Sequence, residues 1–78
     1  MRKKEKKCII SFATTTNAME CEAKCRGNGM AGRLIPLPKE ISAGCGLAWC
    51  TALEEKKALL LFMETEGIIY ESCHEILF

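Results

Sequence analysis

The pattern of apolar and polar positions along the chain predicts two helices among several strands. Residues 8–13 form a short, largely apolar run rich in β-formers, which is typical of a central strand. The polar cluster Thr14–Asn17 follows and is suited to cap a helix by accepting hydrogen bonds from free backbone N–H groups. Beyond it, Ala18, Cys21 and Cys25 recur at helical spacing. The pattern predicts a helix from this cap to about residue 26, with these three side chains buried.

The second half of the chain repeats the alternation of strand and helix. Gly67 is a residue suited to end a helix, because glycine adopts left-handed backbone conformations at little cost. The pattern predicts a strand over 32–38, a connection over 39–46, a strand over 47–53, a helix over 54–66 and a last strand from 68 to 78, irregular near Ser72.

The resulting order is strand, helix, strand, strand, helix, strand. It predicts an α+β protein with the ferredoxin-like βαββαβ two-layer sandwich. Right-handed crossovers give an antiparallel sheet in the order 4-1-3-2 with both helices on one face. Pro36 and Pro38 agree with this order independently. Their missing N–H groups face one side, so the strand that contains them belongs at a sheet edge.

Composition and charge narrow the class of protein. The 78 residues are 49% hydrophobic and 27% charged, with a formal net charge of +1, which suits one globular domain. We assign residues 1–6 to a basic N-terminal tail and residues 7–78 to a single domain. The small net charge and the lack of a long apolar run favour neither nucleic acid nor a membrane as partner. The basic start lacks a hydrophobic segment and a cleavage site, so we expect a cytoplasmic protein.

The six cysteines raise the question of disulfides or metal. Because we expect a reducing compartment, we interpret them as free thiols. Their spacings match no zinc or iron–sulfur pattern and the chain has no Cys-x-x-Cys, so we expect neither a metal nor a cofactor. The sequence assigns no role to four of them, namely Cys8, Cys21, Cys25 and Cys73.

Cys45 is the strongest candidate for chemistry. It stands between Gly44 and Gly46, which give backbone freedom and steric access, in the connection over 39–46. The predicted topology places this connection at the N-terminus of the first helix, where free N–H donors favour a thiolate. The candidate substrate-binding residues around it are Gly44, Gly46, Thr15, Thr16, Asn17, Arg33 and Lys39. A tight turn that happens to contain a cysteine is the alternative interpretation.

Cys50 follows five residues later, in the predicted strand 47–53. An extended chain of that length spans about 16 Å, which is too far for a disulfide with Cys45 unless the chain folds back. Two roles remain open for Cys50, packing in the strand and acting as a resolving thiol.

Two stretches of the chain resemble a known family. Residues 12–19 and above all residues 32–49, which include Arg33-Leu34-Ile35-Pro36-Leu37-Pro38 and Gly44-Cys45-Gly46-Leu47-Ala48-Trp49, are similar to the putative Se/S carrier protein-like family. Similar domains are found attached to TusA-type sulfur carriers. The resemblance implies that the cysteine at position 45 holds sulfur or selenium as a persulfide or selenosulfide.

Three functions follow as hypotheses. The first is a sulfur or selenium carrier, a protein rather than a true enzyme, that exchanges its cargo with donor and acceptor proteins through Cys45. The second is a non-catalytic binding or regulatory module. The third is a thiol-redox or metal sensor that uses Cys45 and Cys50. An exposed strand edge in so small a domain is also compatible with a homodimer.

Overall fold

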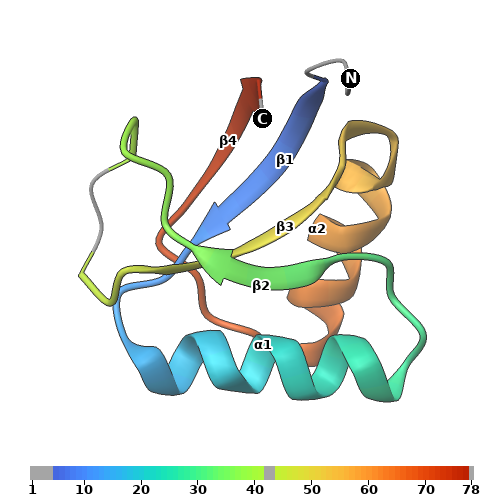
Figure 1. Ribbon diagram of the computed structural model, residues 1–78. Coiled ribbons are helices and arrows are strands. Elements are labelled where there is room, and N and C mark those ends of the chain that lie inside the picture. Colours follow the sequence, from blue (N-terminus) through green and yellow to red (C-terminus); the bar gives the residue numbers. More distant parts are fainter. Residues whose placement is uncertain (1–4, 42–43, 78) are drawn as a thin grey trace.

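The computed structural model describes residues 5–41 and 44–77 (Figure 1). The described elements are β1 (Lys6–Ser11), α1 (Thr15–Gly27), β2 (Arg33–Pro36), β3 (Leu47–Ala52), the 3₁₀ turn η1 (Leu53–Glu55), α2 (Lys56–Glu66) and β4 (Ser72–Leu77). This confirms the predicted order of strands and helices. The predicted helix over 54–66 begins with the 3₁₀ turn before the α-helix proper.

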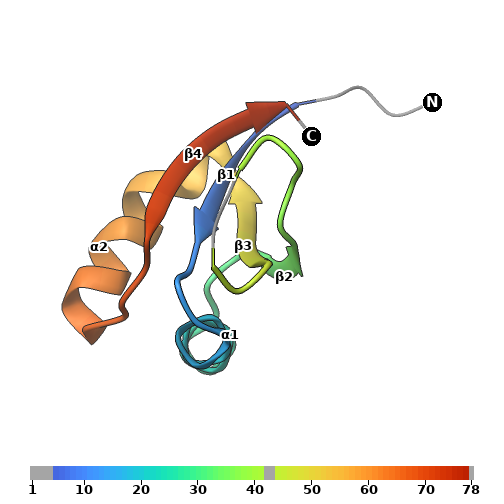
Figure 2. The same ribbon diagram turned by 90° about the vertical axis from the view of Figure 1, so that its left-hand side faces the viewer.

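The strands form an antiparallel sheet in the order β2-β3-β1-β4. This is the predicted order, read from the opposite edge. Both helices lie on one face of the sheet, and the connection between β2 and β3 passes over the other face (Figure 2). The described part of the chain is therefore an α+β structure of two layers, as the sequence predicted.

The proline-containing strand β2 lies at one edge of the sheet. The N–H group of Leu37, which stands between Pro36 and Pro38, donates to the carbonyl of Gly46 at 2.9 Å. Neighbouring positions of a strand point their N–H groups to opposite sides, so both prolines turn their nitrogen away from β3. The structure thus confirms the inference that was drawn from the parity of the prolines.

The ends of the first and last strands differ from the prediction. β1 begins at Lys6 rather than Cys8, because backbone pairing with Leu77 and Ala52 extends the strand beyond its apolar centre. β4 begins only at Ser72, because residues 68–71 are needed to bring the chain from the end of α2 back to the sheet. Phe78, the predicted end of this strand, lies outside the described residues.

Capping residues set the start of α1 and the end of α2. The Thr14 hydroxyl accepts a hydrogen bond from the N–H of Asn17 at 3.1 Å, which satisfies one free donor of α1. Gly67 ends α2 with φ +69°, a left-handed conformation, and the N–H of Ile68 then returns to the carbonyl of Met63 at 2.9 Å. Among the described residues, neither helix is long and apolar enough to cross a membrane.

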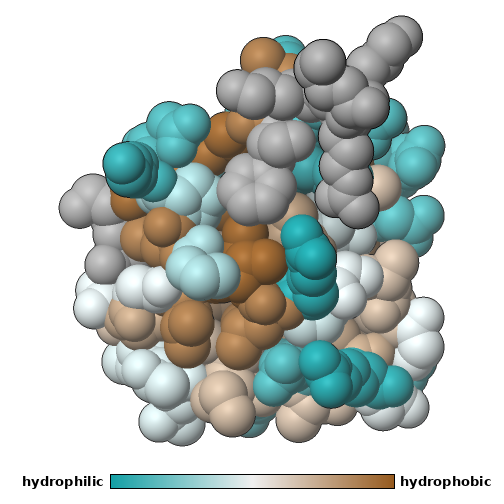
Figure 3. All heavy atoms as spheres, in the orientation of Figure 1, coloured by the Kyte–Doolittle hydropathy of each residue, from teal (hydrophilic) through white to brown (hydrophobic). Residues whose placement is uncertain are grey.

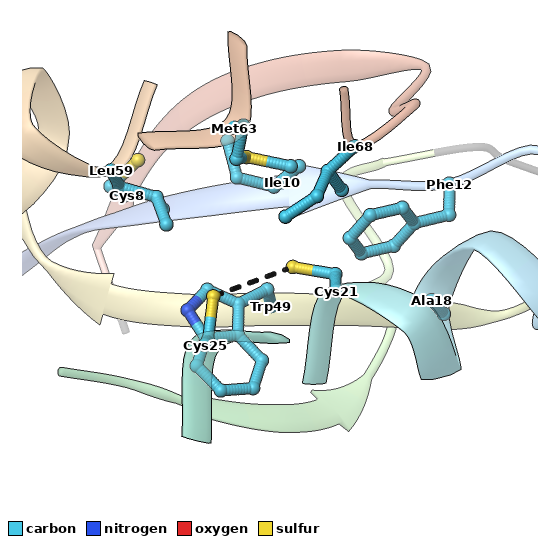
Figure 4. Close-up of a cluster of buried hydrophobic side chains, with 10 residues drawn as sticks. All are labelled: Cys8, Ile10, Phe12, Ala18, Cys21, Cys25, Trp49, Leu59, Met63 and Ile68. Atoms are coloured by element: carbon cyan, nitrogen blue, oxygen red, sulfur yellow. Dashed lines mark hydrogen bonds between the residues drawn. The ribbon is translucent and has the colours of Figure 1, made fainter. Parts of the chain in front are cut away.

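The main core lies between the sheet and the helices (Figure 4). Trp49 is at its centre and is fully buried, and the predicted stripe of α1 packs against it with no exposed surface. Gly32 packs directly against the indole ring of Trp49. A larger residue would not fit there, because a Cβ atom at this position would lie 2.5 Å from the Nε1 of Trp49. The buried members of this helix-face cluster are Cys8, Ile10, Phe12, Ala18, Cys21, Cys25, Trp49, Leu59, Met63 and Ile68.

A second, smaller cluster covers the sheet face opposite the helices. Ile9 is fully buried there although no helix covers it, because Leu37 and Ile41 from the connection after β2 pack on this face. Figure 3 views the same side and shows apolar side chains gathered over β2 and this connection, with hydrophilic side chains around them. The buried members of this open-face cluster are Ile9, Ile35, Ile41, Ala48 and Cys50.

Candidate functional site

Cys45 lies where the connection between β2 and β3 returns to the sheet. We call this connection, residues 37–46, the Cys45 loop; its residues 42–43 lie outside the described part of the chain. Two backbone hydrogen bonds shape the loop, from the N–H of Leu37 to Gly46 at 2.9 Å and from the N–H of Ile41 to Pro38 at 3.0 Å. Ile41 is buried in the open-face cluster, so the loop is anchored on the sheet. The scaffold therefore fixes the place at which the thiol is presented.

The glycines on either side of Cys45 have different structural roles. A Cβ atom on Gly44 would lie 2.6 Å from the carbonyl oxygen of Ala13. The backbone of the Cys45 loop therefore packs directly against the segment that joins β1 to α1. Gly46 has φ +73° with open space around it, and this left-handed conformation turns the chain into β3. Since Ala13 immediately precedes the Thr14 cap, the contact confirms that the Cys45 loop lies beside the start of α1.

The sulfur of Cys45 lies at the border between core and solvent. The side chain is partly exposed and packs against the helix-face cluster. Its Sγ donates a hydrogen bond to the carbonyl oxygen of Leu47, at 3.6 Å. A thiol in this position can be reached by a reactive group of another protein, while the loop holds it against the end of the sheet. Such access is what thiol exchange requires.

The residues predicted to surround Cys45 divide into two groups. Thr15, Thr16 and Asn17 belong to the first turn of α1, next to the Gly44 contact, and Lys39 is exposed in the Cys45 loop itself. Arg33 lies elsewhere: it opens β2, three positions before the loop end of that strand, and its register partner is Cys50. Three strand positions correspond to about 10 Å. The structure therefore brings Arg33 to Cys50 rather than to Cys45.

Cys50 is 6% exposed and belongs to the open-face cluster, whereas Cys45 packs against the helix-face cluster. Burial raises the pKa of the Cys50 thiol, and the charges of Arg33 and Lys7 lower it by smaller amounts. Cys45 and Cys50 thus pack on opposite faces of the sheet. The burial of Cys50 fits a packing role. A role of Cys50 as a resolving thiol stays a prediction, and it would require the Cys45 loop to open.

All six cysteines are free thiols, and the four that the sequence left without a role lie together on the helix face. Cys21 and Cys25 are fully buried, with their sulfurs 3.8 Å apart, and desolvation raises the pKa of both thiols. Cys8 and Cys73 make a second pair, also at 3.8 Å, between β1 and β4. Within the described ranges, no three His, Cys, Asp or Glu side chains come close enough together to hold a metal ion.

Two features of the β1–β4 border could not be found by sequence reasoning. One is the Cys8–Cys73 pair, and the other is a hydrogen-bonded chain in which the Ser72 hydroxyl contacts Ser11 and, at 2.7 Å, the Nε2 of His74. The predicted sheet order places β1 beside β4. The contacts, however, depend on the register of the two strands, which no hairpin turn fixes because β1 and β4 lie at opposite ends of the chain.

The fold and this site together define a class of protein: a small α+β domain that presents a partly exposed cysteine between two glycines on an anchored loop. More particularly, the chain belongs to the family described as "Putative Se/S carrier protein-like", whose model matches residues 7–75. The matched range includes the Cys45 loop and all six cysteines. Neither a curated protein nor a solved structure matches the chain.

Proposed function

We propose that this protein is a sulfur or selenium carrier that holds the chalcogen on Cys45 as a persulfide or selenosulfide. One observation carries the proposal: the family match covers a chain in which this thiol is partly exposed on a loop anchored beside the start of α1. The finer description of the fold, a ferredoxin-like sandwich, belongs to the same proposal and rests on the order of elements and strands.

The chemistry needs two exchange steps at one thiol. In the first step, the Cys45 thiolate attacks the outer sulfur of a donor persulfide and takes it over, and the donor thiolate leaves. In the second step, an acceptor thiolate attacks the same outer sulfur, and Cys45 leaves as a thiolate. Both steps depend on the access that Gly44 and Gly46 provide and on an anion-stabilising environment. The first turn of α1 and Lys39 are the groups that we propose for this stabilisation.

The proposal implies protein partners that donate and accept the chalcogen. We place the protein in the cytoplasm, where its six free cysteines would remain reduced. The burial of Cys50 favours a carrier over a sensor that would use Cys45 and Cys50 as a redox pair.

Loading by a cysteine desulfurase and free cysteine tests the proposal. We expect wild-type protein to gain one sulfur on the tryptic peptide 40–56, located to Cys45 by fragmentation, and Cys45→Ser to gain none on that peptide. The matched control is Cys50→Ser, which removes the other thiol of the same peptide and should load as the wild type does. A loss of two hydrogens in this peptide without added sulfur would instead identify a redox pair. If the peptide neither gains sulfur nor loses hydrogen, the carrier proposal is wrong.

A further inference from the structure

Cys8 and Cys73 form a dithiol of one fully buried and one partly exposed cysteine. Their Sγ atoms are 3.8 Å apart across the border between β1 and β4. Cys73 is partly exposed on β4, which is an edge strand, whereas Cys8 is fully buried behind it. A reagent from solvent therefore meets Cys73 first, and Cys8 is in position for a second step.

A cation stands beside both thiols. The ammonium group of Lys56 is held by the Glu75 carboxylate at 2.7 Å, and this hydrogen bond, followed by the charge of a Cys73 thiolate, raises the pKa of Lys56. Burial, and then the neighbouring Cys73, raises the pKa of Cys8 to about 12, while Lys56 acts in the opposite direction. At neutral pH Cys8 keeps its proton and is fully buried, so a reagent from solvent reaches the partly exposed Cys73 first.

The geometry of the pair disfavours a direct disulfide. Cys8 lies opposite Glu75 in the register and Cys73 lies opposite Ile10, so the two cysteines are diagonal neighbours. Diagonal Cα atoms are about 7–8 Å apart, whereas most disulfides join Cα atoms within about 6.8 Å. The sulfurs would also have to move from 3.8 Å to a bond of about 2.05 Å.

One inserted chalcogen atom removes most of this mismatch. Two sulfur–sulfur bonds of about 2.05 Å, joined at the usual bent angle, place the end sulfurs about 3.3 Å apart, so the two thiols need to approach by only about 0.5 Å, against about 1.8 Å for a direct disulfide. We propose that Cys8 and Cys73 hold one sulfur or selenium atom between their sulfurs, delivered by a small-molecule trisulfide or selenotrisulfide. The inference rests on the proposed carrier function and gives the protein a second cargo site, separate from Cys45.

The loading reaction balances without an oxidant. The Cys73 thiolate attacks the central sulfur of glutathione trisulfide, forms a new sulfur–sulfur bond and releases one glutathione thiolate. Cys8 then gives up its proton and attacks the same central sulfur, which releases the second glutathione thiolate. The product is a Cys73–S–Cys8 trisulfide and two glutathione molecules. Two sulfur–sulfur bonds of glutathione trisulfide break and two sulfur–sulfur bonds form in the protein, so the exchange involves no net oxidation or reduction.

The chain contains a matched control for access. Cys21 and Cys25 have the same sulfur separation of 3.8 Å but are both fully buried on α1. If spacing alone determined loading, the two pairs would react alike. If an accessible first sulfur is also needed, the Cys8–Cys73 pair will load and the helical pair will not.

Reduced protein treated with glutathione trisulfide, blocked by alkylation and digested with trypsin tests the inference. We expect the peptides 8–24 and 58–78 to be joined, with a gain of one sulfur and a loss of two hydrogens, and fragmentation to place the bridge on Cys8 and Cys73. The joined product should be absent from Cys73→Ser, a change at a partly exposed position, and from Cys8→Ala. It should remain in Cys45→Ser, which separates this site from the proposed carrier thiol.

Three results would overturn the inference. They are a joined product that lacks the added sulfur, equal bridging between peptides 8–24 and 25–26 through the helical pair, and an unmodified Cys73. A parallel reaction with oxidised glutathione can form only the direct Cys8–Cys73 disulfide. We expect this disulfide to form far more slowly than glutathione trisulfide forms the Cys8–Cys73 trisulfide. Because loading at Cys45 is read on a different peptide, failure at either site leaves the result at the other one intact.

Discussion

Replacing Trp49 with alanine is expected to lower the free energy of unfolding by about 3–5 kcal/mol, the range for a large aromatic side chain removed from a core. Trp49 is the largest of the fully buried side chains, and Gly32 packs against its indole ring. Small domains have only about 5–15 kcal/mol of stability in total. The variant should therefore be close to unfolded, as urea titration followed by far-ultraviolet circular dichroism would show.

Trp49→Phe is the matched control. The Nε1 of Trp49 is buried and has no hydrogen-bond partner among the described residues, so removing this N–H group costs no hydrogen bond. Phenylalanine keeps much of the apolar contact, and we expect about half the loss caused by alanine. If the phenylalanine variant were as unstable as the alanine variant, a polar contact of the indole would be contributing and the packing explanation would be wrong.

Raising the pH above about 9 is expected to destabilise the protein. Burial raises the pKa of Cys8 from 9.0 to about 12 and also raises the pKa of Cys21, Cys25 and Cys50. The folded protein therefore keeps these thiols protonated at pH values at which the unfolded chain releases the protons. A thiol that keeps its proton in the folded protein throughout this range, such as Cys8, contributes stability that is complete well below pH 9 and falls, well above pH 9, by about 1.4 kcal/mol per pH unit.

Urea unfolding at several pH values between 8 and 10, with a reductant present, measures this dependence. Other groups titrate in the same range, so the informative quantity is the difference between the wild type and Cys21→Ala. Removing one buried thiol should reduce the stability that is lost between pH 8 and pH 10 by about 1.4 kcal/mol in total. Parallel curves for the two proteins would show that Cys21 ionises as easily in the folded protein as in the unfolded chain.

The arrangement of the elements could be predicted from the sequence because local signals agreed with one another. The cap at Thr14 and the stop at Gly67 set one end of each helix, and Pro36 and Pro38, at and just after the end of β2, place that strand at the sheet edge that right-handed crossovers also give it. The position of the Cys45 loop beside α1 followed from that order, without any knowledge of side-chain contacts.

What the sequence could not provide depends on register and on distant contacts. Residues 68–70 resemble a strand because they are apolar and rich in β-formers, but Ile68 is buried in the core while Ile69 and Tyr70 remain exposed in a connection. Likewise, the diagonal contact between Cys8 and Cys73 appears only once β1 and β4 are aligned. The apolar pattern of a strand determines which face is buried, but β1 and β4 are not joined by a hairpin turn that would fix their register.

Transfer of the cargo tests the central claim, that Cys45 carries a chalcogen, most directly. Wild-type protein loaded by a desulfurase with isotopically labelled sulfur, and then freed of the donor, would be mixed with an excess of an acceptor thiol. We expect the label to leave Cys45 and to be recovered on the acceptor. The Cys50→Ser variant should transfer label as well as the wild type does. The Cys45→Ser variant should carry no label on peptide 40–56 and so transfer none from it. If the label remains on the wild-type protein, or if Cys45→Ser passes on as much as the wild type, Cys45 is not the carrier thiol.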